Sequence, residues 1–166
     1  MTGVQTCALP ICESTHKFAA DPDLIGKVRQ AVGVPVRYVH VIRHPLDNIA
    51  TMSRKHNLTL DAAVERYFKL CQTNQWVKTQ VPAAEFMDVR LDDMTARPQE
   101  QLTKLCEFLG LQVTPDYLAD CATLVFSAPR QSRGTVSWTP QAVDGVRAEA
   151  EQFTFLNGYR FDPAPA

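Results

Sequence analysis

The chain has 166 residues, 45% of them hydrophobic, which is enough for one domain with a buried core. Its 17 lysines and arginines nearly balance 18 aspartates and glutamates, so the formal net charge is −1. That balance excludes an overall attraction to nucleic acid or to an anionic membrane, and any anion site has to be local. No apolar run approaches the ~20 residues of a membrane span, and the five cysteines have no metal-ligand spacing.

The first eleven residues, MTGVQTCALPI, have neither a secondary-structure period nor the basic start of a signal peptide. They match the translation of a common short-read sequencing adapter. We interpret residues 1–11 as an artefactual segment, with a natural disordered tail as the alternative. The natural sequence is then expected to begin near Cys12, inside a domain, and to come from a bacterial gene in an environmental library.

The first regular elements are a helix, a strand and a second helix. Asp21-Pro22 is typical of a helix start, with proline in the first turn, and Gly33 ends that helix. Residues 36–42 (VRYVHVI) predict a strand covered on both faces, as in a parallel sheet. Pro45 then begins a helix that runs to about Lys55.

The rest of the chain continues this alternation. Thr59 is expected to cap a longer helix, residues 85–91 alternate with the period of a strand, and Pro98 begins a helix that Gly110 ends. Further helix starts are predicted at Thr114-Pro115 and Thr139-Pro140, separated by a polar loop. The strand–helix alternation predicts a layered α/β domain with a parallel sheet flanked by helices.

Arg43 stands just past the predicted strand, where open α/β sheets bind their ligands. The N-terminus of the following helix would supply free N–H groups and a positive dipole end there. Thr51, two helical turns on, could add a hydroxyl to a phosphate held by the Arg43 fork. The alternative is a functionally silent ion pair between Arg43 and Asp47 at the helix start.

The pattern Arg43-x-Pro45-x-Asp47, followed by a hydroxyl residue eight positions after the arginine, resembles the 3′-phosphate-binding motif of sulfotransferases. These enzymes use 3′-phosphoadenosine 5′-phosphosulfate (PAPS). In that family the arginine and a serine hold the 3′-phosphate of the donor. The resemblance assigns these roles to Arg43 and to Thr51, which keeps the hydroxyl and adds a methyl group.

Two later stretches resemble the family in the same order. Residues 89–94 (VRLDDM), then Pro98 and the Phe-Leu-Gly ending at Gly110, are similar to its Tyr-Glu-Asp-Leu segment and the helix after it. Ser132-Arg133-Gly134, with Trp138 and a final helix ending at Gly158-Tyr159, resembles the part that closes over the 3′-phosphate. Arg133, Gly134 and Arg130 are therefore candidate donor-binding residues, with a solvated basic loop as the alternative.

Ser14-Thr15-His16-Lys17 is similar to the Lys-x-His stretch whose histidine takes the proton of the acceptor in this family. His16 is the candidate catalytic base, because a histidine titrates near neutral pH. An exposed histidine without a catalytic role is the alternative.

The resemblance covers residues 12–161 and implies that residues 12–166 are the C-terminal part of a three-layer P-loop-type domain. It implies transfer of a sulfuryl group from PAPS to a hydroxyl or amine of a small-molecule or carbohydrate acceptor, without a metal and without nucleic acid. The sequence has no Gly-x-x-x-x-Gly-Lys-[Ser/Thr] loop for the sulfate end of the donor. We therefore expect this chain to be inactive alone. We also expect the protein to be cytoplasmic. A nucleotide kinase-like P-loop enzyme and a non-catalytic binding module remain as alternatives.

Overall fold

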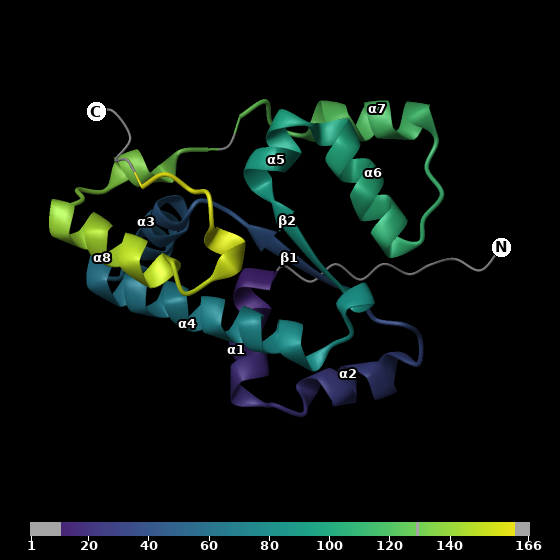
Figure 1. The fold of residues 1–166 in the computed structure, drawn as a ribbon, viewed down its shortest axis with the longest axis horizontal. Helices are drawn as coiled ribbons and strands as arrows, with labels where there is room; N and C mark the ends of the chain where they lie inside the picture. Colours follow the sequence, from purple (N-terminus) through teal and green to yellow (C-terminus); the bar gives the residue numbers. More distant parts are fainter. Residues whose placement is uncertain (1–10, 129, 162–166) are drawn as a thin grey trace.

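The computed structural model describes residues 11–128 and 130–161. In this part of the chain the protein is an α/β structure in which helices surround a small parallel sheet (Figure 1). Residues 1–10 lie outside the described residues, so the interpretation of residues 1–11 as an artefact stays a prediction.

The sheet consists of β1 (Tyr38–Ile42) and β2 (Phe86–Arg90), which run parallel. Tyr38 faces Phe86 at one end of the register, and Ile42 faces Arg90 at the other. The chain passes from β1 to β2 through α3 (Pro45–His56), α4 (Leu60–Gln80) and the short 3₁₀ turn η1 (Ala83–Glu85). A helical crossover of this kind is what parallel strands require.

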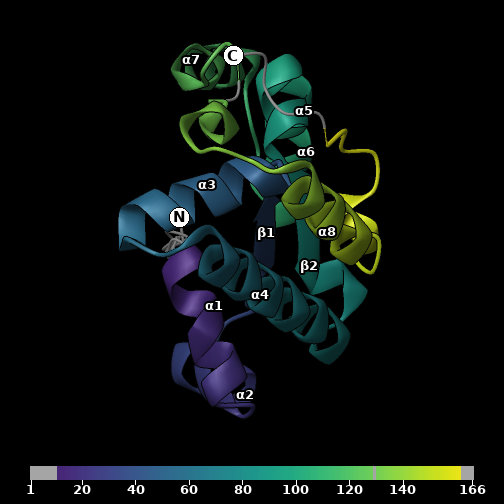
Figure 2. The same ribbon diagram turned by 90° about the vertical axis from the view of Figure 1, so that its left-hand side faces the viewer.

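The main core lies between β1 and the helices α3, α4 and α8 (Pro140–Ala150), which Figures 1 and 2 show on one side of the sheet. Leu46 and Ile49 of α3, Phe68 of α4 and Val146 of α8 are each at most 1% exposed. Burial of such side chains contributes about 1.5–3 kcal/mol each, so this core fixes α3 relative to β1.

The N-terminal helices form a smaller unit next to α4. Helix α1 (Ile11–Ala20) packs on α4, and α2 (Leu24–Val32) ends at Gly33, whose φ of +65° is the left-handed conformation that glycine adopts without strain. Ile25 of α2 is buried in a second apolar cluster with residues of α4.

On the other side of the sheet lie α5 (Leu91–Ala96), α6 (Pro98–Leu109) and α7 (Pro115–Leu124) (Figure 1). Helix α6 ends at Gly110, as the sequence predicts, with φ of +72°. We call these three helices the α5–α7 unit.

The C-terminal part contains the 3₁₀ turn η2 (Ser132–Thr135), then α8, and then a second 3₁₀ turn, η3 (Thr154–Leu156). The prediction of a final helix ending at Gly158-Tyr159 is wrong, because α8 ends at Ala150. The backbone after η3 is irregular, and two of its carbonyl groups contact His44, the cap of α3, and Arg90, the last residue of β2.

Most predicted helix starts are confirmed by their caps. The hydroxyls of Thr59, Thr114 and Thr139 each accept a hydrogen bond from the backbone N–H three residues on. The start at Asp21-Pro22 is wrong by two residues, because the Asp21 carboxylate instead accepts from the N–H of Asp23 in a turn before α2.

One further expectation fails, and two helices were not predicted. The strand at β1 is not covered on both faces, since Val41 is 53% exposed. Helices α1 and α5 were not predicted, because α1 follows the aperiodic first residues directly in the sequence and the six residues of α5 are too few to show a helical period. Among the residues that the structure describes, no helix is both long and apolar enough to cross a membrane.

Candidate anion-binding site

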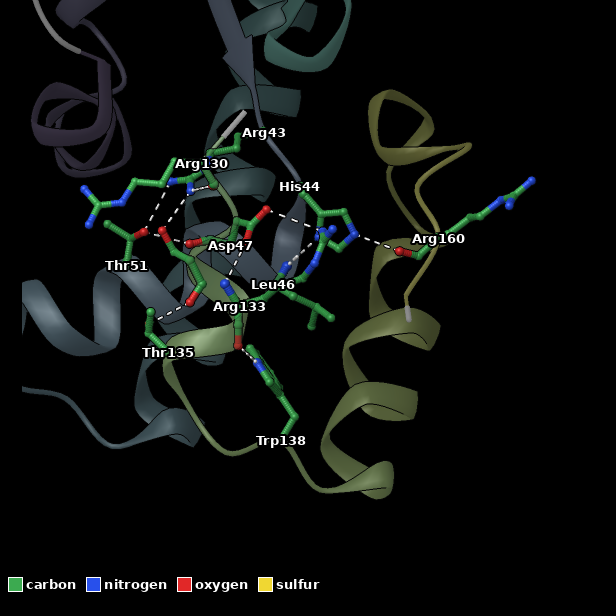
Figure 3. A network of polar contacts seen from close by, with 11 residues as sticks. Arg43, His44, Leu46, Asp47, Thr51, Arg130, Arg133, Thr135, Trp138 and Arg160 are labelled. Atoms are coloured by element: carbon green, nitrogen blue, oxygen red, sulfur yellow. Dashed lines mark hydrogen bonds and ion pairs between the residues drawn. The ribbon is translucent and has the colours of Figure 1, made fainter. Parts of the chain in front are cut away.

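Arg43 directly follows β1 and reaches over the first two turns of α3 (Figure 3). Its Nη1 donates to Oγ1 of Thr51 at 3.2 Å, and its Nη2 donates to Oγ of Ser132 at 2.9 Å and to the backbone carbonyl of Arg130. The guanidinium thus joins α3 to a turn almost ninety residues later in the sequence. We call Arg43, Thr51, Ser132 and the Asp47–Arg133 pair the anion site.

The Thr51 hydroxyl is oriented by its own helix. It donates to the carbonyl of Asp47 at 2.8 Å, one turn earlier, and accepts from Arg43. With its proton used by the backbone, the oxygen faces Arg43 with its lone pairs.

Asp47 holds the η2 turn in place rather than pairing with Arg43. Its carboxylate accepts from the backbone N–H of Arg133 at 2.7 Å and lies 3.4 Å from Nη1 of the same residue. The carbonyl of Arg133 in turn accepts from Nε1 of Trp138 at 2.9 Å. Asp47 is 3% exposed, so this is a buried, charge-assisted contact. The alternative in which Arg43 and Asp47 form the helix-start ion pair is not what the structure shows.

The start of α3 is closed by His44, so the expected free N–H groups are absent there. Nδ1 of His44 accepts from the N–H of Leu46 at 3.2 Å, and the carbonyl of His44 accepts from the next two N–H groups. Pro45 has no N–H to offer. An anion at Arg43 would therefore be bound by side chains and by the helix dipole, not by open N–H groups of the first turn.

The local charge at Arg43 is positive. Burial lowers the pKa of Arg43, the carboxylates of Asp47 and Asp92 oppose that shift, and the like charges of Arg130 and Arg133 add to it. Nε of Arg43 and Nε of Arg133 are buried without a hydrogen-bond partner within the described residues. Buried donors without partners are uncommon and call for an explanation, which a bound anion would supply.

The structure brings together Arg43, Thr51 and Arg133 as the sequence predicts. Arg130 contributes its carbonyl while its side chain is exposed, and Gly134 is exposed beside Arg133. His16 is exposed on α1, and within the part of the chain that the structure describes no hydrogen bond or ion pair joins it to the anion site. The roles assigned to these residues stay predictions.

Sequence reasoning did not single out Ser132 or His44. Ser132 is buried with its hydroxyl on Arg43, and His44 is the buried cap of α3. Ser132 begins the Ser-Arg-Gly stretch on which the resemblance rests, so that motif could have identified it. Nothing in the sequence around His44 indicated its partner, which lies 116 residues away. Over 11–128 and 130–161, no cluster of three or more His, Cys, Asp or Glu residues could hold a metal ion.

The structure is an α/β fold in which an arginine and two hydroxyl side chains meet at the carboxyl end of a parallel strand, a place where such sheets commonly bind ligands. Residues 36–115 match the model of a family described as "Sulfotransferase family". The structure is similar to one titled "Sulfotransferase Domain from the Curacin Biosynthetic Pathway", with a TM-score of 0.56 and 18% sequence identity. The similarity covers 82% of this chain and 59% of that one, so the chain spans less than two thirds of the matched domain.

No curated protein sequence matches the chain. The match over residues 36–115 supports a sulfotransferase family assignment, and the similar structure shows the same fold. The matched residues contain β1, α3 and β2, and so they contain Arg43 and Thr51.

Proposed function

We propose that the protein belongs to a PAPS-dependent enzyme that transfers a sulfuryl group to a hydroxyl or amine of a small-molecule or carbohydrate acceptor. In this proposal the anion site binds the 3′-phosphate of the donor. The observation that carries it is the convergence of the Arg43 guanidinium with the hydroxyls of Thr51 and Ser132 at the carboxyl end of β1.

The chemistry of these groups suits a phosphate. The Thr51 hydroxyl orients the guanidinium fork by accepting from it, the Ser132 hydroxyl can donate to an anion, and Nε of Arg43 and Nε of Arg133 have no partner within the described residues. A phosphate oxygen would replace the carbonyl of Arg130 as the acceptor for Nη2, exchanging a neutral acceptor for a charged one. Charge-assisted hydrogen bonds are the stronger kind, so this exchange favours the dianion.

A 3′-phosphate lies away from the bond that breaks, so the anion site would contribute binding and orientation rather than bond-making. The S–O bond to the 5′-phosphate would break while a new S–O bond forms to the acceptor, and the acceptor proton would pass to a base, for which His16 is the candidate. Charge would build on the leaving phosphate, as in phosphoryl transfer, and would need donors of its own.

The finer fold assignment, a three-layer P-loop-type domain, is part of this proposal. The sequence contains no Gly-x-x-x-x-Gly-Lys-[Ser/Thr] loop to meet the sulfate end of the donor. We therefore propose that this chain of 166 residues binds the 3′-phosphate but does not by itself transfer sulfate. Sulfate transfer by the purified chain would refute the second statement and leave the first standing.

The test is isothermal titration calorimetry with adenosine 3′,5′-bisphosphate, compared with ATP and with adenosine 5′-monophosphate. We expect the bisphosphate to bind most tightly. Arg43→Ala should weaken it by about tenfold to a hundredfold, the equivalent of one charged hydrogen bond of about 1.5–3 kcal/mol. Thr51→Ala should lose affinity while Thr51→Ser retains it, because serine keeps the hydroxyl.

The matched control is Arg54→Ala, which removes the same charge from an exposed position near the other end of α3. It should bind the bisphosphate like the wild type. Equal losses in Arg43→Ala and Arg54→Ala would show only a general charge effect. A preference for ATP would favour the kinase-like alternative and overturn the proposal.

A further inference from the structure

His44 lies between Arg43 and the first residue of α3 and is 6% exposed. Its Nδ1 accepts from the N–H of Leu46 at 3.2 Å, and its Nε2 lies 2.7 Å from the carbonyl oxygen of Arg160 (Figure 3). Its ring also meets the ring of Tyr159 edge-on, with the centroids 5.1 Å apart. One imidazole thus joins the helix that follows Arg43 to the C-terminal segment.

The two partners fix the protonation state of the ring. The Leu46 N–H can only donate, so Nδ1 must present a lone pair. The Arg160 carbonyl can only accept, so Nε2 must carry the proton. Both bonds exist together only in the neutral tautomer with hydrogen on Nε2. In the imidazolium, the Nδ1–H would point at the Leu46 N–H.

The surroundings favour the neutral form. Burial is the largest influence and lowers the pKa of His44 below 6.5, its ordinary value. The Arg160 carbonyl opposes this shift, Arg133 of η2 adds to it, and the carboxylates of Asp47 on α3 and Asp92 on α5 oppose it. The Tyr159 phenol also neighbours His44, and burial raises its pKa, so it stays neutral in the same range.

The C-terminal segment is attached to the strand ends at a second point. Nη1 of Arg90, the last residue of β2, donates to the carbonyl of Asn157 at 2.7 Å, and its guanidinium lies 4.2 Å from the Tyr159 ring centroid. His44 supplies the matching attachment at the end of β1. Loss of the His44 bonds would therefore free the β1 side of this segment while the β2 side stays bound.

We propose that neutral His44 is a positioning residue for the anion site. It holds the first turn of α3 against the C-terminal segment, so that the side chains of Arg43 and Asp47 keep their contacts with η2. The inference rests on the proposed function. Arg43 precedes the cap and Asp47 lies in the turn that the cap closes, so both depend on the His44 backbone. Asp47 then transmits any displacement to Arg133 through its 2.7 Å contact. Protonation of His44 breaks the Leu46 bond while Nε2–H still donates to Arg160, and we expect the loosened cap to weaken phosphate binding.

Two substitutions separate the bonds that His44 makes. Asparagine places an acceptor near the position of Nδ1 and is a good helix cap, but it is too short to reach Arg160. Glutamine places a donor near the position of Nε2 but is a poor cap. His44→Asn therefore keeps the bond to the Leu46 N–H and loses the bond to the Arg160 carbonyl. His44→Gln keeps the Arg160 bond and loses the Leu46 bond. His56→Asn, the same change at an exposed position at the end of α3, is the matched control.

The experiment measures affinity for adenosine 3′,5′-bisphosphate by calorimetry from about pH 5 to pH 8, the range in which histidine titrates. The phosphate itself also titrates here, so each variant is compared with wild type at the same pH. We expect His44→Asn and His44→Gln to bind about threefold to tenfold more weakly than wild type at neutral pH, the equivalent of one hydrogen bond. Wild type should lose affinity on acidification more steeply than either variant, and His56→Asn should follow wild type.

A ligand-free measurement separates failure of this inference from failure of the proposed function. The ¹⁵N signals of His44 should show the Nε2–H tautomer at neutral pH, and acidification should shift the Arg43 guanidinium signals in wild type but not in His44→Asn. Bisphosphate binding that is unchanged in both variants across the pH range would overturn the inference. So would an Arg43 signal that does not follow the titration of His44. If wild type binds no bisphosphate, the proposed function fails, and the Arg43 signal alone decides the role of His44.

Discussion

The anion site and the α5–α7 unit are held by different kinds of polar contact. In and beside the anion site, part-buried contacts join α3 and its cap to segments 86 to 116 positions later, as in the Asp47–Arg133 and His44–Arg160 bonds. In the α5–α7 unit the ion pairs of Arg97 and of Lys104 are exposed and join residues three or four positions apart.

The difference shows where each region obtains its stability. Exposed pairs within a helix contribute little, because water and salt screen them. A buried carboxylate has lost its hydration and depends on its partners, so its environment cannot change without cost. The α5–α7 unit also leaves Leu124 and Phe126 each 83% exposed at its end, next to the polar loop. We therefore expect substitutions to separate the two regions by their effect on the free energy of unfolding.

The largest expected effect is at Asp47. Asp47→Ala removes the acceptor of the Arg133 N–H and leaves a mostly buried guanidinium without its carboxylate. We expect the free energy of unfolding to fall by about 3 kcal/mol, the scale for breaking one side of a buried pair. Urea unfolding followed by circular dichroism measures it.

Asp144→Ala is the control for this change, because Asp144 pairs with Arg147 one turn away on exposed α8 surface. It should leave the urea midpoint within error of wild type. Asp47→Asn keeps a carbonyl oxygen near the Arg133 N–H, so its urea midpoint should lie between those of Asp47→Ala and Asp144→Ala. A midpoint for Asp47→Ala equal to that of Asp144→Ala would remove the distinction between the regions.

An intermediate effect is expected at Asp88, which links β2 to β1 and α4. Its carboxylate contacts Nδ1 of His40 at 2.9 Å and Nζ of Lys78 at 2.5 Å. Burial alone would raise the pKa of Asp88, but these two partners outweigh it and hold the pKa below its ordinary value of 3.8. A lowered pKa in the folded state means that the unfolded chain binds the proton more readily.

The stability from Asp88 is therefore fully present above the unfolded-state pKa and is lost as the pH falls through the folded-state pKa. Unfolding free energies measured from about pH 6 down to pH 3 should decline less steeply in Asp88→Asn than in wild type. Asp120→Asn, on exposed α7 surface, is the control and should keep the wild-type slope. Equal slopes in all three proteins would contradict the assignment.

The elements of the anion site that could be predicted from sequence are those set by local rules. A β-branched and aromatic run indicated β1, and Pro45 indicated the start of α3, which places Thr51 two turns into the helix that follows Arg43. These rules need only neighbouring residues, and for that reason they identified both residues without the tertiary structure.

The contacts that the sequence could not predict are those in which a polar side chain binds a residue far away in the sequence. Asp47 had a nearby arginine available in Arg43, yet it pairs with Arg133, because Arg43 is directed to Thr51 and Ser132. His44 was not singled out, because its acceptor is the backbone carbonyl of Arg160, and no pattern of side chains in the sequence identifies a backbone partner. The exposed face of Val41 has the same origin, since strand composition does not reveal which face remains uncovered.

The smallest expected effect is at Arg97 in the α5–α7 unit. Arg97 lies 3.0 Å from Asp93 and 3.3 Å from Glu100, and its side chain is 54% exposed. Glu100 also pairs with Lys104 at 2.6 Å, so Arg97→Ala leaves Glu100 with a cation. We expect an unfolding midpoint and a bisphosphate affinity within error of wild type, at low and at high salt, because the pairs are solvated and lie outside the anion site. A loss of bisphosphate affinity in Arg97→Ala would mean that the α5–α7 unit and the anion site are coupled, and the contrast between the two regions would then describe their contacts but not their function.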